Sequence, residues 1–99
     1  MPNYILTNKA LEDISRIWDY TYEKWSEEQA DKYYSLILIS CGELGDKRVV
    51  GKKYPEVHPD VFGYKIGQHI IFYRPTKGEK VEIARVLHSR MDLRIRFQE

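Results

Sequence analysis

Two runs of strand-forming residues in the last third of the sequence constrain the fold most strongly. The first run, 70–73, is β-branched and aromatic, and it is broken by Pro75 and by a turn around Lys77 and Gly78. A second run of the same kind, 81–87, follows at once, so the pattern predicts a β-hairpin. This hairpin leads directly into a short arginine-rich segment, 88–96. We expect function to reside in this basic, partly apolar tail at one end of a sheet.

Charge is distributed unevenly along the chain. The formal net charge is only +1, yet residues 1–46 contain nine acids and four bases, whereas residues 47–99 contain six acids and twelve bases. The first half suits a solvated acidic face, and the second half suits an anionic partner or an acidic protein surface. Since the basic excess is local and small, we expect no direct sequence-specific binding of nucleic acid.

Length and cysteine content limit the class of protein. The 99 residues fit one domain, 1–99, with a single core. The sequence has no apolar run long enough to cross a bilayer and no secretory pattern at its start. Cys41 is the sole cysteine, which excludes an intramolecular disulfide and fits a reducing compartment. We therefore expect a cytoplasmic protein with no membrane partner.

Apolar residues recur with the 3.6-residue period of a helix across two stretches of the first half. We expect the first helix to begin after a cap at Thr7 or Asn8, with Glu12 and Asp13 in its first turn. A second helix should begin at Ser26, which with Gln29 forms a capping box, and run to a glycine stop at 42 or 45. Almost no linker separates the helices, so they should form an antiparallel hairpin.

The remaining pattern completes an α+β fold. A short strand is expected at 4–6, an exposed loop with one short strand at 46–63, and three strands at about 61–67, 69–75 and 80–88. Gly67 and Gln68 fit a tight turn in which glycine takes a positive φ. The order is β-α-α-β-β-β with a short C-terminal segment, which predicts a helical hairpin on one face of a small antiparallel sheet.

Each helix has an apolar face wide enough for two seams. One seam can cover the sheet, which leaves large aromatic residues on the other. These residues serve either the core of a small domain or a partner surface, because tyrosine favours half-buried interfaces. The second seam on the first helix, with one tyrosine of the second helix, comprises Leu11, Trp18, Tyr22, Trp25 and Tyr34.

The sequence contains no recognisable catalytic or metal-binding constellation. Ser89 and His88 are neighbours on a strand end and should point to opposite faces, so they cannot act as nucleophile and base. The three histidines lack metal spacing among themselves and with Cys41, and nothing implies a cofactor. An acid–base ribonuclease remains possible, with His88 as base and with cations from Lys65, Arg74, Arg85, Arg90, Arg94 and Arg96. Against it, Arg85 is expected to pair with Glu82 or with a carboxylate of the tail.

The stretch FGYKIGQHIIFYRPTKGEKVEIARVLHSRMD, residues 62–92, resembles the signature of ParE toxins in the RelE/ParE superfamily of toxin–antitoxin systems. The first half is similar in layout, with Tyr-Ile-Leu-Thr at 4–7, Ala-Leu-x-Asp-Ile at 10–14 and Ala30 early in the second helix. The resemblance covers almost the whole chain. Its C-terminal motif is specific, and its N-terminal motif is generic.

This resemblance implies the β-α-α-β-β-β fold and a small antitoxin of the ParD type as partner. The antitoxin is expected to lay apolar side chains along the second aromatic seam defined above. The implied target is DNA gyrase, inhibited by binding rather than by catalysis. Its expected contact surface is the tail, namely His88, Arg90, Met91, Asp92, Arg94 and Arg96, in which Asp92 braces Arg90 or caps the segment.

Two alternatives stay open. The ribonuclease branch of the superfamily cleaves mRNA on the ribosome, and Lys65, Arg85, Arg90 and His88 would serve that role here. The chain resembles this ribonuclease branch less well than it resembles the ParE toxins. Its tail carries Phe97 where the ribonuclease branch has a tyrosine, and a phenylalanine cannot exchange a proton. The third reading is a non-toxic domain that only binds an antitoxin as a decoy. If the tail is a separable appendage, truncation after Leu87 should abolish target inhibition and spare antitoxin binding.

Overall fold

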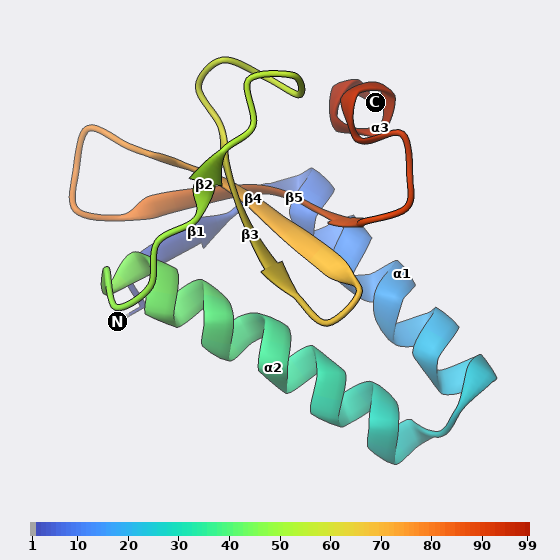
Figure 1. The fold of residues 1–99 in the computed structure, drawn as a ribbon. Coiled ribbons are helices and arrows are strands. Elements are labelled where there is room, and N and C mark those ends of the chain that lie inside the picture. The colour runs from blue at the N-terminus through green and yellow to red at the C-terminus, as the bar shows by residue number, and fades with distance from the viewer. Residues whose placement is uncertain (1) are drawn as a thin grey trace.

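The computed structural model describes residues 2–99, which form a mixed sheet covered on both faces. Figure 1 shows helices α1 and α2 on one side of the sheet and α3 on the other. The predicted α+β class and the order of its helices and strands are confirmed, and the C-terminal segment is a helix. The elements are β1 (Tyr4–Leu6), α1 (Asn8–Lys24), α2 (Glu27–Gly45), β2 (Lys52–Lys53), β3 (Phe62–Ile66), β4 (His69–Pro75), β5 (Val81–His88) and α3 (Leu93–Gln98).

The strand order is β1-β5-β4-β3-β2, and the prediction of a wholly antiparallel sheet is wrong at its first strand. β2, β3, β4 and β5 pair antiparallel, but β1 pairs parallel to β5, with Tyr4 opposite Val81 and Leu6 opposite Ile83. Parallel neighbours require a long crossover connection. Here the helical hairpin and the meander β2 to β4 together supply that connection, so the first and last strands become neighbours.

Hydroxyl caps begin both helices as the sequence predicts, but the predicted capping box at Ser26 is only half formed, because the Gln29 side chain makes no hydrogen bond among the described residues. The Thr7 side chain accepts a hydrogen bond from Ala10 N at 3.0 Å, and the Ser26 side chain accepts one from Gln29 N at 3.1 Å. Such caps satisfy backbone donors that the first helical turn leaves free. Glu27 and Glu28 occupy the first turn of α2 as expected, but α1 has no acid there because it already begins at Asn8. The expected place of Glu12 and Asp13 in that turn is therefore wrong.

The sheet separates two apolar cores. The larger core lies between the sheet and the helical hairpin and includes Ile37, Ile71 and Ile83. The smaller core lies on the opposite face, where Phe72 and Leu87 pack with Phe97 of α3 and with the loop around 54–61. Both faces of β4 and β5 are therefore dry, which explains why these strands are continuous apolar runs rather than alternating ones.

A β-bulge at residues 72–73 of the β4–β5 ladder decides which β5 side chains meet each core. Phe72 pairs with Arg85, whereas the next residue, Tyr73, pairs with Ile83, so Ala84 is the extra residue of β5. Before the bulge the odd-numbered Ile83 faces the helical hairpin, and beyond it the even-numbered Val86 does so. The bulge thus turns Arg85 and Leu87 toward α3.

No helix within residues 2–99 has the length and apolar character needed to cross a membrane.

Candidate functional site

A buried ion pair anchors the end of β5 to α1. Arg85 is 6% exposed, and its Nε and Nη2 donate to the two carboxylate oxygens of Asp13 at 2.7 and 2.9 Å. Val86 N also donates to Asp13, at 3.0 Å. β1 ends at Leu6 and leaves this stretch of β5 without a neighbouring strand, so the carboxylate takes the place of a strand carbonyl. The hydrogen bonds to Asp13 raise the pKa of Arg85 further above its ordinary value, against the opposing effect of burial.

The Asp13–Arg85 ion pair differs from the pairing expected for Arg85 from the sequence. Arg85 pairs neither with Glu82 nor with a carboxylate of the tail, because α1 supplies the carboxylate of Asp13 instead. Glu82 lies 3.5 Å from Arg74. The remaining Arg85 nitrogen, Nη1, donates to the backbone carbonyl of Arg96 in α3. Arg85 therefore bonds both α1 and α3, and its burial leaves the guanidinium poorly accessible to a phosphate in solvent.

The six residues predicted to face a target lie on one continuous segment from the end of β5 into α3. Asp92 is the N-cap of α3 and accepts a hydrogen bond from Ile95 N at 3.3 Å, which confirms its capping role. His88 is half-buried, and its Nδ1 accepts a hydrogen bond from Arg90 N at 3.1 Å. Arg90, Met91, Arg94 and Arg96 are exposed. The sequence reasoning missed Ile95, which is 60% exposed and adds apolar area to the same segment.

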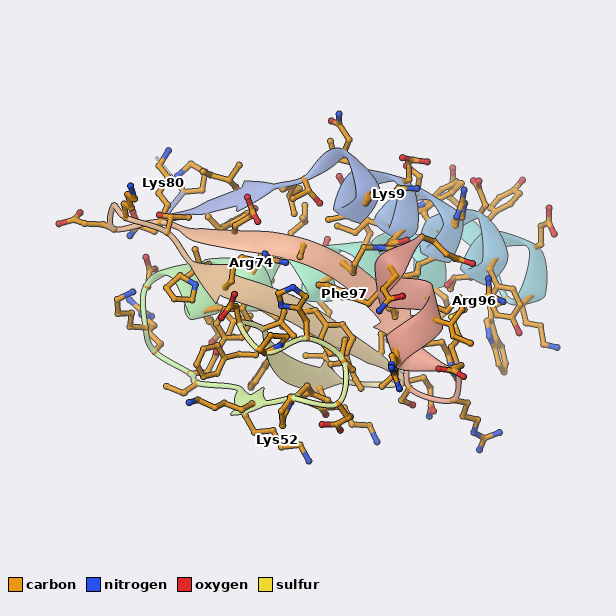
Figure 2. All side chains as sticks on the ribbon, turned by 90° about the horizontal axis from the view of Figure 1, so that it is seen from above. Lys9, Lys52, Arg74, Lys80, Arg96 and Phe97 are labelled. Atoms are coloured by element: carbon orange, nitrogen blue, oxygen red, sulfur yellow. The ribbon has the colours of Figure 1, made fainter. Side chains whose placement is uncertain are left out.

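The tail is not a separable appendage. Leu93 and Phe97 of α3 pack against the smaller core, and the Phe97 ring meets Phe72 edge-on with centroids 5.8 Å apart. Arg74 lies above the same ring, with Cζ 5.9 Å from its centroid (Figure 2). Truncation after Leu87 would therefore remove part of the core as well as the exposed cations. The separability expected from the sequence does not fit this packing.

The residues predicted to face an antitoxin are partly exposed along the helical hairpin. Trp18 and Tyr22 stack with ring centroids 5.2 Å apart, and Trp18 Nε1 donates to Asp31 of α2 at 3.0 Å. Leu11, Tyr22 and Tyr34 are about half exposed and Trp25 is 72% exposed, so this seam does not serve the core. Contacts thus join only part of the predicted set directly. Three further large apolar residues of the helical hairpin are exposed but were not predicted as part of this surface, namely Tyr20, Leu36 and Ile39.

Two histidines and a tyrosine meet where β4 begins and β5 ends. His69 and His88 are cross-strand partners with ring centroids 5.1 Å apart, and the Tyr33 hydroxyl lies 2.6 Å from His69 Nδ1. Burial lowers the pKa of His69 to about 4, with a smaller contribution from His88, so His69 is neutral near pH 7. Burial also raises the pKa of Tyr33. The spacing of the histidines along the sequence does not by itself indicate this contact, which follows from the antiparallel pairing of β4 with β5.

A pocket of 570 Å³ opens beside this cluster. It lies between the end of α1, the start of α2, the β3–β4 turn and the end of β5, and Figure 1 shows that turn lying over α2. The predicted positive φ at Gly67 is confirmed at 49°. A Cβ at Gly67 would lie 2.8 Å from Tyr33 Oη, so glycine permits the turn to pack on Tyr33. The pocket is lined by Trp25 from the predicted antitoxin seam and by His88 from the predicted target surface.

Comparison with known proteins assigns the family. A family model described as ParE toxin of type II toxin-antitoxin system, parDE, matches residues 4–93. The chain is 31% identical over 90 residues to Toxin ParE1 of Mycobacterium tuberculosis, covering 91% of this chain and 92% of the relative. It is 31% identical over 94 residues to Toxin ParE1 of Caulobacter vibrioides, covering 95% and 96% respectively.

A solved structure described as the chromosomal ParDE TA system from P. aeruginosa has the same fold. The TM-score is 0.72 at 23% sequence identity, and the match covers 89% of this chain and 96% of the other. Together with the family model, which spans nearly the whole chain, these relatives agree with the resemblance found in residues 62–92. This chain belongs to the ParE toxin family of type II toxin–antitoxin systems.

Proposed function

We propose that this protein inhibits DNA gyrase in the cytoplasm by binding it through the segment 88–96, and that a ParD-type antitoxin neutralises it. The observation that carries the proposal is the character of that segment. It presents Arg90, Arg94 and Arg96 beside exposed Met91 and Ile95. Arginine and methionine are enriched at protein interfaces because they combine polar contacts with adaptable apolar contact.

The support of this segment favours recognition by a rigid surface. Asp92 caps α3, Phe97 anchors it in the smaller core, and Arg85 bonds its Arg96 carbonyl. A surface whose backbone is already fixed loses little conformational freedom when it binds. The exposed arginines can therefore meet an acidic partner in one arrangement.

The antitoxin site in this proposal is the exposed aromatic seam of the helical hairpin. Leu11, Trp18, Tyr22 and Trp25 recur along one side of α1, and Tyr34 adds to them from α2. Exposed apolar side chains that recur along one side of a helix on a small domain favour a protein-binding surface. An amphipathic segment of the antitoxin would cover this seam, while the segment 88–96 would bind the target.

Ribonuclease chemistry receives less support from the geometry. Arg85 is committed to Asp13, and the Nδ1 atom of His88 is occupied by Arg90 N. Phe97 packs against the smaller core and has no hydroxyl group, so it cannot act as a catalytic tyrosine. Lys65 and Arg90 remain exposed, but two cations without a general base do not make a cleavage site.

The test is a pair of assays with purified toxin, one on gyrase supercoiling and one on translating ribosomes with a defined mRNA. Inhibited supercoiling with intact mRNA is the expected result. Codon-positioned cleavage with unaffected supercoiling would refute the proposal, and inactivity in both assays would indicate a decoy.

Charge reversal at the tail sharpens the test. Arg90→Glu/Arg94→Glu should abolish inhibition without lowering the melting temperature, since both side chains are exposed. Lys77→Glu/Lys80→Glu is the matched control, because it also reverses two cations, residues 77 and 80 lie in the β4–β5 connection, and Figure 2 places Lys80 at the opposite end of the molecule from Arg96. Equal loss from both variants would mean that net charge, rather than this segment, determines inhibition. The ParD-type antitoxin should bind both variants as it binds the unmodified toxin.

A further inference from the structure

The pocket beside the histidine cluster takes Trp25 from the predicted antitoxin seam and His88 from the segment 88–96, but most of its lining belongs to neither surface. Its walls are rich in aromatic side chains, contributed by Tyr20, Trp25 and Tyr33. Lys24 is the one lysine or arginine of the lining, and the lining contains no aspartate or glutamate. The volume of 570 Å³ falls within the range of pockets that hold small molecules. The pocket therefore favours a flat ligand that carries negative charge.

Several polar groups of the lining have no partner within the protein. In the described chain, Lys24 makes no ion pair. The side-chain amides of Gln29 and Gln68 make no hydrogen bond, whereas the backbone groups of both residues do. In contrast, the Tyr33 hydroxyl is committed to His69 and to Gln68 N. An amide side chain offers both a donor and an acceptor, which suits the edge of a heterocycle. The ammonium group suits a phosphate.

We propose that this pocket binds a purine mononucleotide, with the base against the aromatic walls and the phosphate at Lys24. Aromatic side chains stack on bases because every base presents a π-face, and the two glutamine amides can bond the edge of the ring. Of the segment 88–96 only His88 lines the pocket, and the exposed arginines of that segment lie outside it.

The wall formed by Tyr33 is preorganised for this ligand. Its hydroxyl is held by His69 Nδ1 at 2.6 Å, and the β3–β4 turn closes on its ring at Gly67, where a side chain would collide. Trp25 stands at the rim with its backbone fixed by a hydrogen bond from its N–H to Thr21 O at 2.9 Å. One wall is thus rigid, whereas the exposed Trp25 side chain is free to close over a bound base.

The test is calorimetric titration of the full-length toxin with adenosine 5′-monophosphate (AMP). Adenosine, inorganic phosphate and N-acetyltryptophan serve as separate probes. We expect AMP to bind with a Kd of about 0.1 mM and more tightly than either of its parts. Absence of AMP binding up to about 1 mM would overturn the proposal. Tighter binding of N-acetyltryptophan than of AMP would also overturn it, because the pocket would then recognise an aromatic residue with a carboxylate.

Variants assign the binding to this pocket. Lys24→Met should weaken AMP binding by about tenfold and leave adenosine unchanged. Trp25→Ala should weaken both by about fivefold or more through lost stacking. Tyr34→Ala is the matched control, since Tyr34 is an exposed aromatic residue of α2 outside the lining. Melting temperatures near that of the unmodified toxin establish that the variants fold. Unchanged AMP affinity in both pocket variants would refute the location.

Discussion

The buried Asp13–Arg85 pair yields the most demanding prediction. Asp13→Asn retains an oxygen that can accept from Val86 N, but it leaves the guanidinium of Arg85, 6% exposed, without a counter-charge. Removing one partner of a buried pair costs about 3–5 kcal/mol. A domain of this size has a total stability of only about 5–15 kcal/mol, so the variant should be close to unfolding. Its melting temperature should fall by at least about 12 °C, and urea denaturation followed by circular dichroism measures the free energy directly.

A double-mutant cycle isolates the charge pair from the shape of the site. Arg85→Met should itself be costly, because it leaves the Asp13 carboxylate buried with only Val86 N as a donor and releases the Arg96 carbonyl. Asp13→Asn/Arg85→Met should lose less stability than the two single variants added together, by about 2 kcal/mol or more.

The matched control is Glu12→Gln, at the residue preceding Asp13. Glu12 pairs with Arg16 at 3.8 Å on the open surface, where an ion pair contributes about 0–1 kcal/mol. Its variant should therefore unfold like the unmodified toxin. Additive losses in the cycle, or a cost for Asp13→Asn as small as that for Glu12→Gln, would refute the view that this pair holds α1 and β5 together.

Three further predictions concern stability. Because the pKa of His69 is lowered from 6.5 to about 4, the unfolded chain takes up a proton at a higher pH than the folded chain, so stability should fall as pH drops through this window. His69→Asn should abolish this fall, of about 1–2 kcal/mol after solvent screening, in urea denaturation at pH 7 and pH 5. Gly67→Ala should cost about 1–3 kcal/mol, since φ is 49° and the new Cβ meets Tyr33. Gly78→Ala should change stability little, because its new Cβ would make only an ordinary contact, 3.9 Å from Thr76 Oγ1; thermal melts compare the two variants. Gly42→Ala should stabilise α2 by about 1 kcal/mol, because nothing lies within 4 Å of the added Cβ, and an unchanged midpoint would contradict this.

Periodicity and cap chemistry sufficed to predict most of the secondary structure. Thr7 and Ser26 cap the helices, and the strands expected at 69–75 and 80–88 are observed at 69–75 and 81–88. These features are local, because each depends on a few neighbouring residues. The parallel pairing of β1 is not local, since an isolated strand of three residues carries no signal for the direction of its partner.

The ionic anchor could not be read from the sequence. Asp13 looks like an ordinary acid near a helix start, and its partner lies 72 positions away. The pairing depends on the bulge at 72–73 and on the early end of β1, neither of which has a sequence signature here. In contrast, the contact of His69 with His88 was within reach, because antiparallel pairing of the two predicted strands places the first residue of one opposite the last residue of the other.

The smaller apolar core, on the α3 face of the sheet, is the main feature of the fold that the sequence analysis does not predict. The basic composition of the tail predicts an appendage, although Asp92 followed by Leu93 and Phe97 is the pattern of a capped helix with apolar residues four positions apart. The arginines between these positions obscure the apolar spacing. Continuous apolar runs in β4 and β5 were a further indication that both faces of the sheet are covered.

The pairing of β1 with β5 determines when the toxin can fold during its synthesis on the ribosome. Thr7 donates through its hydroxyl to the carbonyl of Ala84, 77 positions later, and Leu6 lies opposite Ile83. The first strand therefore has no partner until nearly the entire polypeptide has been synthesised. Such distant contacts make folding slow, because a long loop must close before they form. A nascent or prematurely terminated chain that lacks residues 81–88 cannot complete the five-stranded sheet, so the full fold first appears when synthesis is almost finished.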